Sequence, residues 1–315
     1  MTKPLVSIII PCYNGADTIT RALTGIVQQT YRPIQLIVVN DGSTDNSDQI
    51  IRKLEPEICK ASISFIYIVQ KNLGLGGAIN TGLQHVVGSY LGWVDADDEL
   101  LPKSIELRVS FLEEHPDFGS ISSDAFYAED TNWENSLGKV VYNPEENSKP
   151  DQFLPMLLGR STFCCGCHLV RTEVFRRANG GMAINPFRYG QNMQLLLPVY
   201  YSSKHAFLNI PLYKYRINAQ SMSSEIKNKS LRSFYSLRKE YIKNTRRTLQ
   251  RIQGLPKRMR KYYEIMFRKL IYEGNLDAAL QHRKSVDILL WKAKIKLSVF
   301  LLAIHPKHHQ QERFQ

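Results

Sequence analysis

Short apolar runs alternate with segments of helical spacing along the first hundred residues. The apolar runs are rich in Ile, Val and Leu and are typical of strands; they lie at 5–10, 34–40, 62–69 and 90–94. The segments between them place apolar residues three and four positions apart, at 17–29, 47–54 and 77–87. Repeated βα units whose strands are apolar on both faces predict an α/β fold with a doubly wound, mostly parallel sheet.

The pattern continues less regularly to about residue 220. Residues 102–115 predict an amphipathic helix with a proline in its first turn, and residues 128–151 predict an irregular lid over the same sheet edge. A further strand, two helices and a late strand pair are then predicted, at 162–170, 171–178, 192–202 and 206–217.

Charge divides the chain into two parts. The whole sequence of 315 residues carries a formal charge of +12, but residues 1–225 hold 19 Lys and Arg against 23 Asp and Glu, and residues 226–315 hold 22 against 6. We therefore predict a globular domain over 1–225 and a basic helical region over 226–315. The basic region is expected to meet anions.

The last helical segment, 285–304, has an apolar stripe beside basic residues. The stripe contains Ile288, Trp291, Ile295, Val299 and Leu302, and Lys292 and Lys296 lie off it. Such a helix can lie in the headgroup region of an anionic membrane leaflet. The alternative is a helix that packs on the main domain and leaves its basic face in water.

Apolar length and cysteine content bear on where the protein acts. No run reaches the roughly 20 apolar residues of a membrane span, and the apolar start of the chain is too short for a signal peptide. The sequence predicts a cytoplasmic protein, with peripheral attachment to the cytoplasmic face of the inner membrane as an option. Five cysteines, three of them in 164–167, fit reduced core residues, with a zinc site as the alternative.

Polar motifs follow each of the first four predicted strands, at 11–17, 40–47, 70–77 and 95–98. Since the carboxyl ends of parallel strands meet at one edge of a sheet, these motifs are expected to build one ligand site. The last motif holds Asp95, Asp97 and Asp98. The first two side chains would leave an extended segment on the same side and bind a divalent cation, whereas an exposed acidic turn that caps the next helix is the alternative.

The order of these motifs resembles the inverting glycosyltransferases of family two, which have the GT-A fold. The resemblance covers roughly residues 5–220 and rests on "PCYN", "VVNDGSTDNS", "KNLGLGGAINTGL" and "GSYLGWVDADDELLP". It implies transfer of a sugar from a nucleotide-sugar to an acceptor hydroxyl with inversion. The expected donor is UDP-linked, the expected metal is Mn²⁺ or Mg²⁺, and the expected acceptor is a saccharide or a lipid-linked sugar of surface polysaccharide synthesis.

The resemblance also assigns residues to the donor site. Pro11, Tyr13 and Asn14 would line the nucleoside pocket, with Tyr13 against the base. Asp41 would accept a hydrogen bond from the pyrimidine ring, in a place where the family often has two acids and this chain has Asn40 before Asp41. The remaining assignments place Lys71 near the nucleotide, Asp95 at the ribose or sugar, Asp97 on the metal and Arg216 on the diphosphate.

The acceptor side departs from the family. A Glu-Asp pair at the start of a late helix is replaced by Gln191 and Asn192, and neither amide accepts a proton near neutral pH. They would position the acceptor while another group acts as base. The candidates for the base are Asp124, then Glu129 or Asp130, with His168 more typical of a core residue.

Three other functions compete with this interpretation. The missing Glu-Asp pair suggests a non-catalytic subunit that binds a sugar-nucleotide or a carbohydrate. Nucleic-acid binding through the basic region is not favoured, because its aromatic and basic residues keep helical spacing and form no known reader. A nucleotidyltransferase also places acids after a strand, but the order of the two acidic motifs, at 40–45 and 95–98, argues against it.

Overall fold

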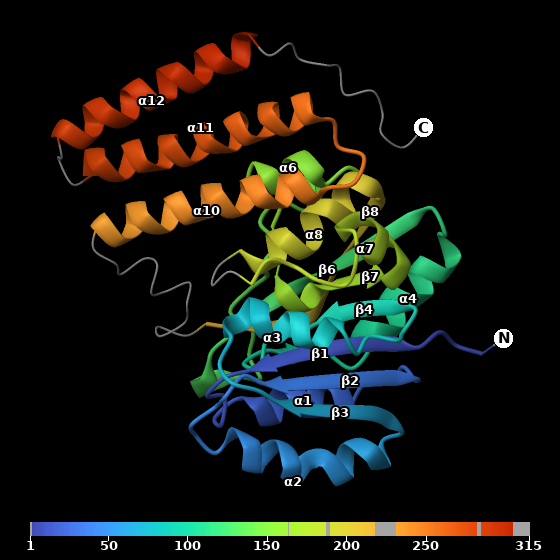
Figure 1. Ribbon diagram of the computed structural model, residues 1–315. Helices are drawn as coiled ribbons and strands as arrows, with labels where there is room; N and C mark the ends of the chain where they lie inside the picture. Colours follow the sequence, from blue (N-terminus) through green and yellow to red (C-terminus); the bar gives the residue numbers. More distant parts are fainter. Residues whose placement is uncertain (1, 163, 187–189, 218–230, 282–284, 305–315) are drawn as a thin grey trace.

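A single eight-stranded sheet organises the chain in a computed structural model that describes residues 2–162, 164–186, 190–217, 231–281 and 285–304 (Figure 1). The strands are β1 (Val6–Cys12), β2 (Ile34–Asn40), β3 (Ile63–Val69), β4 (Tyr90–Trp93), β5 (Glu99–Leu100), β6 (Phe118–Ala128), β7 (His168–Arg171) and β8 (Lys204–Arg216). Their order across the sheet is β3-β2-β1-β4-β7-β6-β8-β5.

The helices connect the strands and continue past the last one. They are α1 (Ile19–Val27), α2 (Ser47–Lys60), α3 (Gly74–Leu83), α4 (Ser104–Glu114), α5 (Pro144–Asn147), α6 (Phe153–Leu157), α7 (Thr172–Asn179), α8 (Gln191–Ser202), α10 (Leu231–Arg251), α11 (Lys257–Gln281) and α12 (Ser285–Ile304). Short 3₁₀ turns lie at Asp130–Asn132 and Cys165–Cys167.

Parallel pairing dominates the part of the sheet that the sequence predicts best. β3, β2, β1 and β4 pair in parallel, β7 then runs antiparallel between β4 and β6, and β6 and β8 are parallel again. The prediction of a mostly parallel α/β sheet with a helical C-terminal region is confirmed.

Burial on both faces explains why β1 and β2 are mostly apolar. Along β1, Ile8 and Ile10 enter one core with α1, α2 and α4, whereas Ile9 points into a second core with α3 and α8. Alternate side chains of a strand leave opposite faces, so a strand covered by helices on both sides keeps no polar face. This arrangement directs the ends of β1, β2 and β4 to one edge.

Two predicted strands have other bounds. The expected strand pair at 206–217 is one strand, β8, which pairs with β6 through a register irregularity near Asp124. The expected strand at 162–170 is interrupted, because Cys165–Cys167 forms a 3₁₀ turn, and the strand that the structure describes there is His168–Arg171. In that turn Gly166 packs on the ring of Tyr213, where an added Cβ would come within 2.0 Å of the ring. Only glycine allows this approach.

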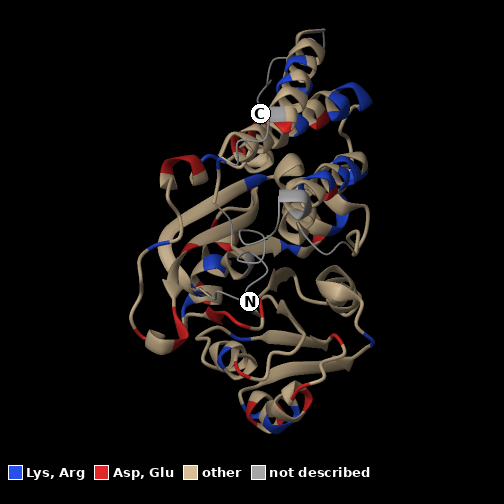
Figure 2. Cartoon of the chain, turned by 90° about the vertical axis from the view of Figure 1, so that its left-hand side faces the viewer, with Lys and Arg blue, Asp and Glu red and all other residues tan. Residues whose placement is uncertain are grey.

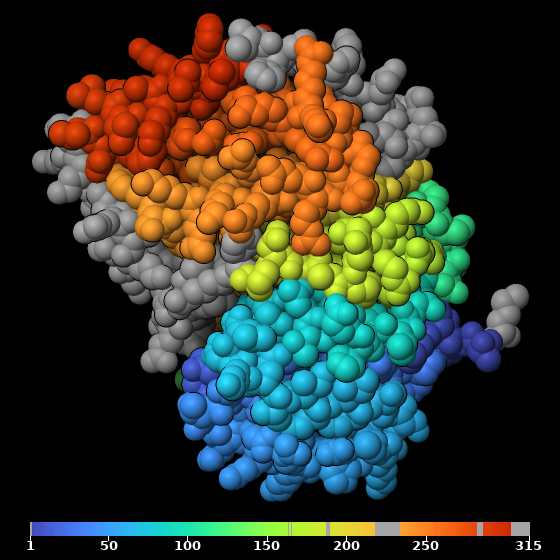
Figure 3. All heavy atoms as spheres, viewed as in Figure 1, coloured from blue at the N-terminus to red at the C-terminus, as the bar shows by residue number. Residues whose placement is uncertain are grey.

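The basic helices form a stack on one side of the sheet, with α12 outermost (Figure 1). α10 and α11 share the second core with α8: Tyr263 of α11 lies 5.0 Å from Phe153 between ring centroids. Leu249 of α10 and Ile252, which follows α10, are buried in the same cluster. In the space-filling view the orange helices lie against the yellow-green part of the chain (Figure 3), and α10 contacts α8. The predicted boundary at residue 225 lies outside the described residues and stays a prediction.

The described helices contain none that is both long enough and apolar enough to cross a bilayer.

Candidate active site

The loops after β1 and β2 are joined by hydrogen bonds at the carboxyl edge of the sheet. Asn14 adopts the left-handed region with φ of 49°, and its Oδ1 accepts a hydrogen bond of 2.8 Å from the backbone N–H of Thr44. The backbone N–H of Asn14 donates to Ser43 Oγ at 3.0 Å. Asparagine tolerates this conformation better than most residues. Tyr13 is thereby left exposed beside buried Pro11 at the mouth of the site.

Asp41 is buried directly after β2 and ties two loops together. Its Oδ1 accepts hydrogen bonds from Gln70 Nε2 at 2.6 Å and from the backbone N–H of Leu73 at 2.8 Å. Asn40 is buried beside it and accepts from the backbone N–H of Ser43. Lys71 is exposed on the loop that Asp41 holds. The structure thus brings Asn14, Asp41 and Lys71 to adjoining loops, as predicted from their places after the strands.

The three aspartates after β4 converge through a turn. The backbone N–H of Asp98 donates to the carbonyl oxygen of Asp95 at 3.2 Å, so the segment is not extended as the sequence suggested. One carboxylate oxygen from each of Asp95, Asp97 and Asp98 nevertheless lies within 4.8 Å of the others. Among the His, Cys, Asp and Glu side chains that the structure describes, these three form the one group with metal-binding spacing.

Asp98 has a structural role within this group. Its buried carboxylate accepts hydrogen bonds from the Tyr213 hydroxyl at 2.5 Å and from the backbone N–H of Arg216 at 2.8 Å. Burial, followed by the charges of Asp97 and Asp95, raises its pKa. The predicted alternative, that Asp98 caps the next helix, is wrong, since α4 begins at Ser104 and Asp98 holds the end of β8.

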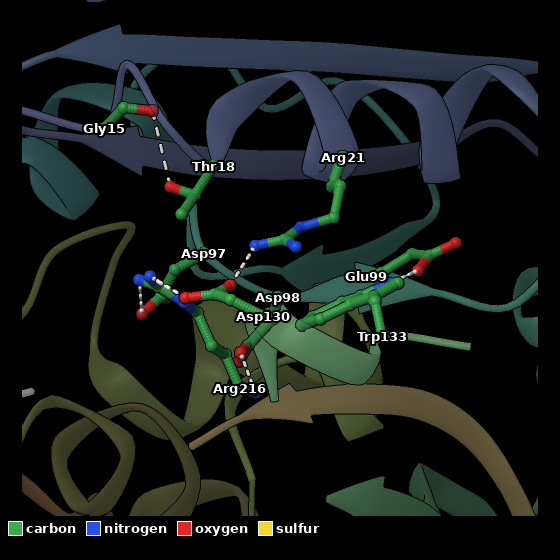
Figure 4. A network of polar contacts seen from close by, with 9 residues as sticks. All are labelled: Gly15, Thr18, Arg21, Asp97, Asp98, Glu99, Asp130, Trp133 and Arg216. Atoms are coloured by element: carbon green, nitrogen blue, oxygen red, sulfur yellow. Dashed lines mark hydrogen bonds and ion pairs between the residues drawn. The ribbon is translucent and has the colours of Figure 1, made fainter. Parts of the chain in front are cut away.

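Arg216 lies between two carboxylates at the site (Figure 4). Its Nε donates to both carboxylate oxygens of Asp130 at 2.9 Å, and its Nη1 lies 4.0 Å from Asp97 Oδ2. Arg21 Nη2 donates to Asp130 Oδ1 at 2.7 Å. The hydrogen bond from Arg216 lowers the pKa of Asp130, and burial raises the pKa of Asp97 while Arg216 opposes that rise. Asp97, the predicted metal ligand, and Arg216, the predicted diphosphate contact, are therefore neighbours.

Trp133 fixes the 129–135 loop to the same edge. Its ring lies 3.9 Å from the Arg21 guanidinium carbon, measured to the ring centroid, and its Nε1 donates to Glu99 Oε2 at 2.5 Å (Figure 4). The predicted position of this loop over the sheet edge agrees with these contacts. Sequence reasoning missed Arg21 and Trp133; the tryptophan in an otherwise polar loop was the signal that could have pointed to a packing role.

The amide pair predicted for the acceptor side lies beside the end of β4. Asn192 Oδ1 accepts a hydrogen bond of 3.1 Å from Nε1 of the buried Trp93, two residues before Asp95. Gln191 is the first residue of α8 and is buried. The start of α8 is thus close to the aspartate cluster, and the Asn192 oxygen already orients the indole.

Two of the predicted candidate bases, Asp124 and His168, are buried. Asp124 is 1% exposed within β6, and its Oδ1 accepts from the backbone N–H groups of Ala125 at 2.7 Å and Val141 at 3.0 Å. His168 is buried, with its Nδ1 2.8 Å from the carbonyl oxygen of Cys164. Asp124 Oδ2 also lies 3.6 Å from Lys139 Nζ. The assignment of Asp124 as the base stays a prediction, because a base must reach the proton that it removes from a bound acceptor. Cys164 is itself buried, as expected for a core cysteine.

Curated proteins are similar in sequence to about a third of this chain. "Uncharacterized glycosyltransferase RP339" of Rickettsia prowazekii is 40% identical over 110 residues, which are 35% of this chain and 32% of that protein. "Glycosyltransferase GlyA" of Streptococcus pneumoniae is 36% identical over 110 residues, 35% of this chain and 15% of that protein. The chain thus spans about a third or less of the curated relatives it matches.

Solved structures share the fold over greater lengths. S. aureus TarS 1-349, solved in complex with UDP-GlcNAc, has a TM-score of 0.67 at 15% identity and covers 93% of this chain and 81% of its own. The mannosyltransferase PcManGT from Pyrobaculum calidifontis, solved with GDP-Man and Mn²⁺, has a TM-score of 0.53 at 15% identity, over 96% and 86% of the two chains. The sequence profile of Glycosyl transferase family 2 matches residues 7–178, more than half of the chain, and the protein therefore belongs to glycosyl transferase family 2.

Proposed function

We propose that the protein is a metal-dependent inverting glycosyltransferase that moves a sugar from a UDP-linked donor to a saccharide or lipid-linked acceptor in surface polysaccharide synthesis. One observation carries the proposal. Asp97 of the aspartate cluster and Arg216 adjoin at the sheet edge where Tyr13, Asn14 and Asp41 also lie. Acidic groups for a cation, a guanidinium for phosphate and an exposed ring for a base are what a nucleoside diphosphate requires.

The nucleoside end of the donor is assigned to the loops after β1, β2 and β3. The exposed ring of Tyr13 offers a face on which a base can stack, and Asp41 offers a carboxylate for the pyrimidine N–H. Lys71 adds a positive charge on the adjoining loop. The similar structures solved with UDP-GlcNAc and GDP-Man support a nucleotide-sugar as the ligand class.

The aspartate cluster fits a hard divalent cation, either Mn²⁺ or Mg²⁺. Carboxylate oxygens are preferred ligands of such ions, and the burial that raises the pKa of Asp97 is offset when a cation binds the charged form. Asp97 would ligate the ion, with Asp95 beside it at the sugar, while Asp98 keeps β8 in place. When bound, the cation supplies positive charge to the leaving diphosphate.

Arg216 supplies a second positive charge from the protein itself. In the structure it pairs with Asp130, and its 4.0 Å approach to Asp97 supports a contact with a diphosphate bound at the cluster. A diphosphate oxygen is a stronger partner for a guanidinium than a partly exposed carboxylate is. We infer that Arg216 moves from Asp130 to the donor when the donor binds.

Acceptor binding is assigned to the start of α8. Gln191 and Asn192 would position the acceptor hydroxyl near the end of β4, and the hydrogen bond from Trp93 holds Asn192 there. The hydroxyl must lose its proton to a base on the face of the sugar opposite the diphosphate. Asp124 is buried and Asp130 pairs with the arginine of the diphosphate side, so we propose exposed Glu129 as the base to test first.

A panel of nucleotide-sugars with Mn²⁺ in a thermal-shift experiment tests the donor assignment. A bound donor stabilises the folded chain in proportion to the logarithm of its concentration over its dissociation constant, so the tightest donor gives the largest shift. We expect a UDP-linked sugar to give that shift, with the protein acting in the cytoplasm where such donors are made. Stabilisation without any release of nucleoside diphosphate would instead support a non-catalytic binding subunit, the function that the Gln191–Asn192 pair favours.

A further inference from the structure

α12 has two apolar faces, and the part of the chain that the structure describes covers only one of them. The inner face holds Trp291, which is buried between Tyr235 of α10 and Tyr272 of α11 at centroid distances of 5.2 and 5.7 Å. Most of the stripe that the sequence singled out, including Ile288 and Ile295, is partly buried on this side. That stripe therefore anchors α12 to α10 and α11, so the expectation that this stripe itself faces a membrane is wrong for Trp291. The alternative of packing on the main domain is replaced by packing on the other two helices.

The outer face presents large apolar side chains to solvent. Its members are exposed by 45% to 81% and are Val286, Leu289, Leu290, Leu297 and Phe300. At about 100° per residue these positions fall within one arc of the helix, on the side opposite Trp291. A contiguous apolar surface of this kind on a folded protein marks an interaction site.

Positive charge borders this apolar face on one side. Lys292 and Lys296 are exposed along one border of it. The other two helices of the stack also carry exposed basic residues, namely Lys239, Lys243, Lys257, Arg258 and Lys261. Lys and Arg gather on this helical stack in Figure 2. Two copies of so basic a surface repel one another, whereas an anionic surface is complementary to it.

We propose that the outer face of α12 docks on the surface of an anionic lipid bilayer, with the helix lying along the membrane plane. Its apolar side chains would enter the headgroup and acyl boundary while the lysines meet lipid phosphates. Because α12 is outermost in the stack and the sheet lies beyond α10 and α11, docking leaves the carboxyl edge of the sheet accessible (Figure 1). This inference goes beyond the proposed sugar transfer and does not depend on it.

Sedimentation of the full chain with vesicles tests the apolar half of the proposal. Binding to phosphatidylcholine vesicles that contain phosphatidylglycerol is expected, with little binding to phosphatidylcholine alone. The triple variant L289Q/L297Q/F300Q should lower the partition coefficient about 100-fold, since three partly inserted side chains each lose roughly a factor of five. The matched control V87Q/I210Q changes two exposed apolar residues of the main domain and should bind as the original protein does.

A charge-reversal variant tests the electrostatic half. K292E/K296E should weaken binding to the anionic vesicles by about tenfold or more, whereas K53E/K60E on exposed positions of α2 should not. Thermal unfolding midpoints must stay unchanged in all variants, because every altered side chain is exposed.

Three outcomes would overturn the proposal. They are a chain that stays in the supernatant with every vesicle, equal binding by L289Q/L297Q/F300Q, and self-association in sedimentation velocity that this variant abolishes without any vesicle binding. The last outcome would assign the face to a second copy.

Discussion

Arg216 joins Asp130 to Asp97: its Nε donates to both carboxylate oxygens of Asp130 at 2.9 Å, and its Nη1 lies 4.0 Å from the carboxylate of Asp97. The two acids lie on different loops. The backbone N–H of Arg216 donates a hydrogen bond of 2.8 Å to Asp98, which fixes the backbone at this position. The backbone of Arg216 is thus held in place, while its guanidinium group has two anionic partners, Asp130 and Asp97. A donor diphosphate would be a third anionic partner, and it would bind the guanidinium group more strongly than either carboxylate does.

Replacement of Arg216 tests its role on the diphosphate. Arg216→Ala should lower kcat/KM for the donor by about 100-fold, because a charge-assisted contact to the leaving group is lost. Arg216→Lys should recover part of this loss. Arg176→Ala removes an exposed arginine paired with Glu173 and serves as the control. Steady-state kinetics at varied donor concentration measures kcat/KM for each variant. Equal values for the Arg216 and Arg176 variants would show that Arg216 does not contact the donor.

Asp130→Asn should strengthen binding of the nucleoside diphosphate. The substitution keeps the shape of the side chain but removes the charge that holds Arg216 and Arg21. Because the pair is partly exposed, the expected gain in affinity is only about twofold to fivefold. Titration calorimetry of UDP with Mn²⁺ measures it. Weaker binding in the variant would mean that Asp130 positions Arg216 for the donor rather than competing with it.

The base is tested with three isosteric substitutions. Glu129→Gln should lower kcat by at least about 100-fold with little change in the donor KM, as expected for loss of general-base catalysis. Asp124→Asn keeps an oxygen for the N–H groups of Ala125 and Val141 and should leave kcat within about threefold. Asp130→Asn should act on donor binding instead. A large loss of kcat in the Asp124 variant alone would return that residue to the role that the sequence suggested.

Stability should fall on acidification because of His205. This imidazole is buried between Ser120 Oγ at 2.9 Å and Ser122 Oγ at 2.8 Å, and burial, with the nearby His168, places its pKa well below the usual value of 6.5. A lowered folded-state pKa means that the unfolded chain binds the proton more readily. The contribution of His205 is therefore complete above pH 6.5 and decreases as the pH falls below it.

Thermal unfolding between pH 7.5 and about pH 5 measures this dependence. His205→Gln should flatten the curve of midpoint against pH, whereas His85→Gln, at an exposed position, should leave the slope as it is. A slope that His205→Gln leaves unchanged would assign the acid sensitivity to other groups.

Local patterns were enough to predict the parallel half of the sheet. The runs that became β1, β2 and β3 are apolar on both faces, and the polar motifs follow them at the ends where parallel strands must place a site. Asp41 and Asp97 could therefore be assigned to one edge by their places after the strands. Asp98 could not, because its partners Tyr213 and Arg216 lie more than a hundred residues away along the chain.

Other features depended on contacts between distant segments. Arg216 and Asp130 are 86 residues apart in the sequence, and no spacing pattern predicts that they pair. A helical wheel of α12 shows apolar residues on two sides, and only the positions of Tyr235 and Tyr272 decide that Trp291 points inward. The burial of Asp124 likewise follows from the register between β6 and β8.

Release of nucleoside diphosphate from UDP-linked donors, with and without Mn²⁺, tests the central claim most directly. The claim is that Asp97 holds a divalent cation against the donor diphosphate. We predict metal-dependent release that Asp97→Asn lowers by about 1,000-fold. The control Asp117→Asn changes an exposed acid that pairs with Lys204, and it should leave the release unchanged. Release that needs no metal, or that survives in the Asp97 variant at the original rate, would contradict the account.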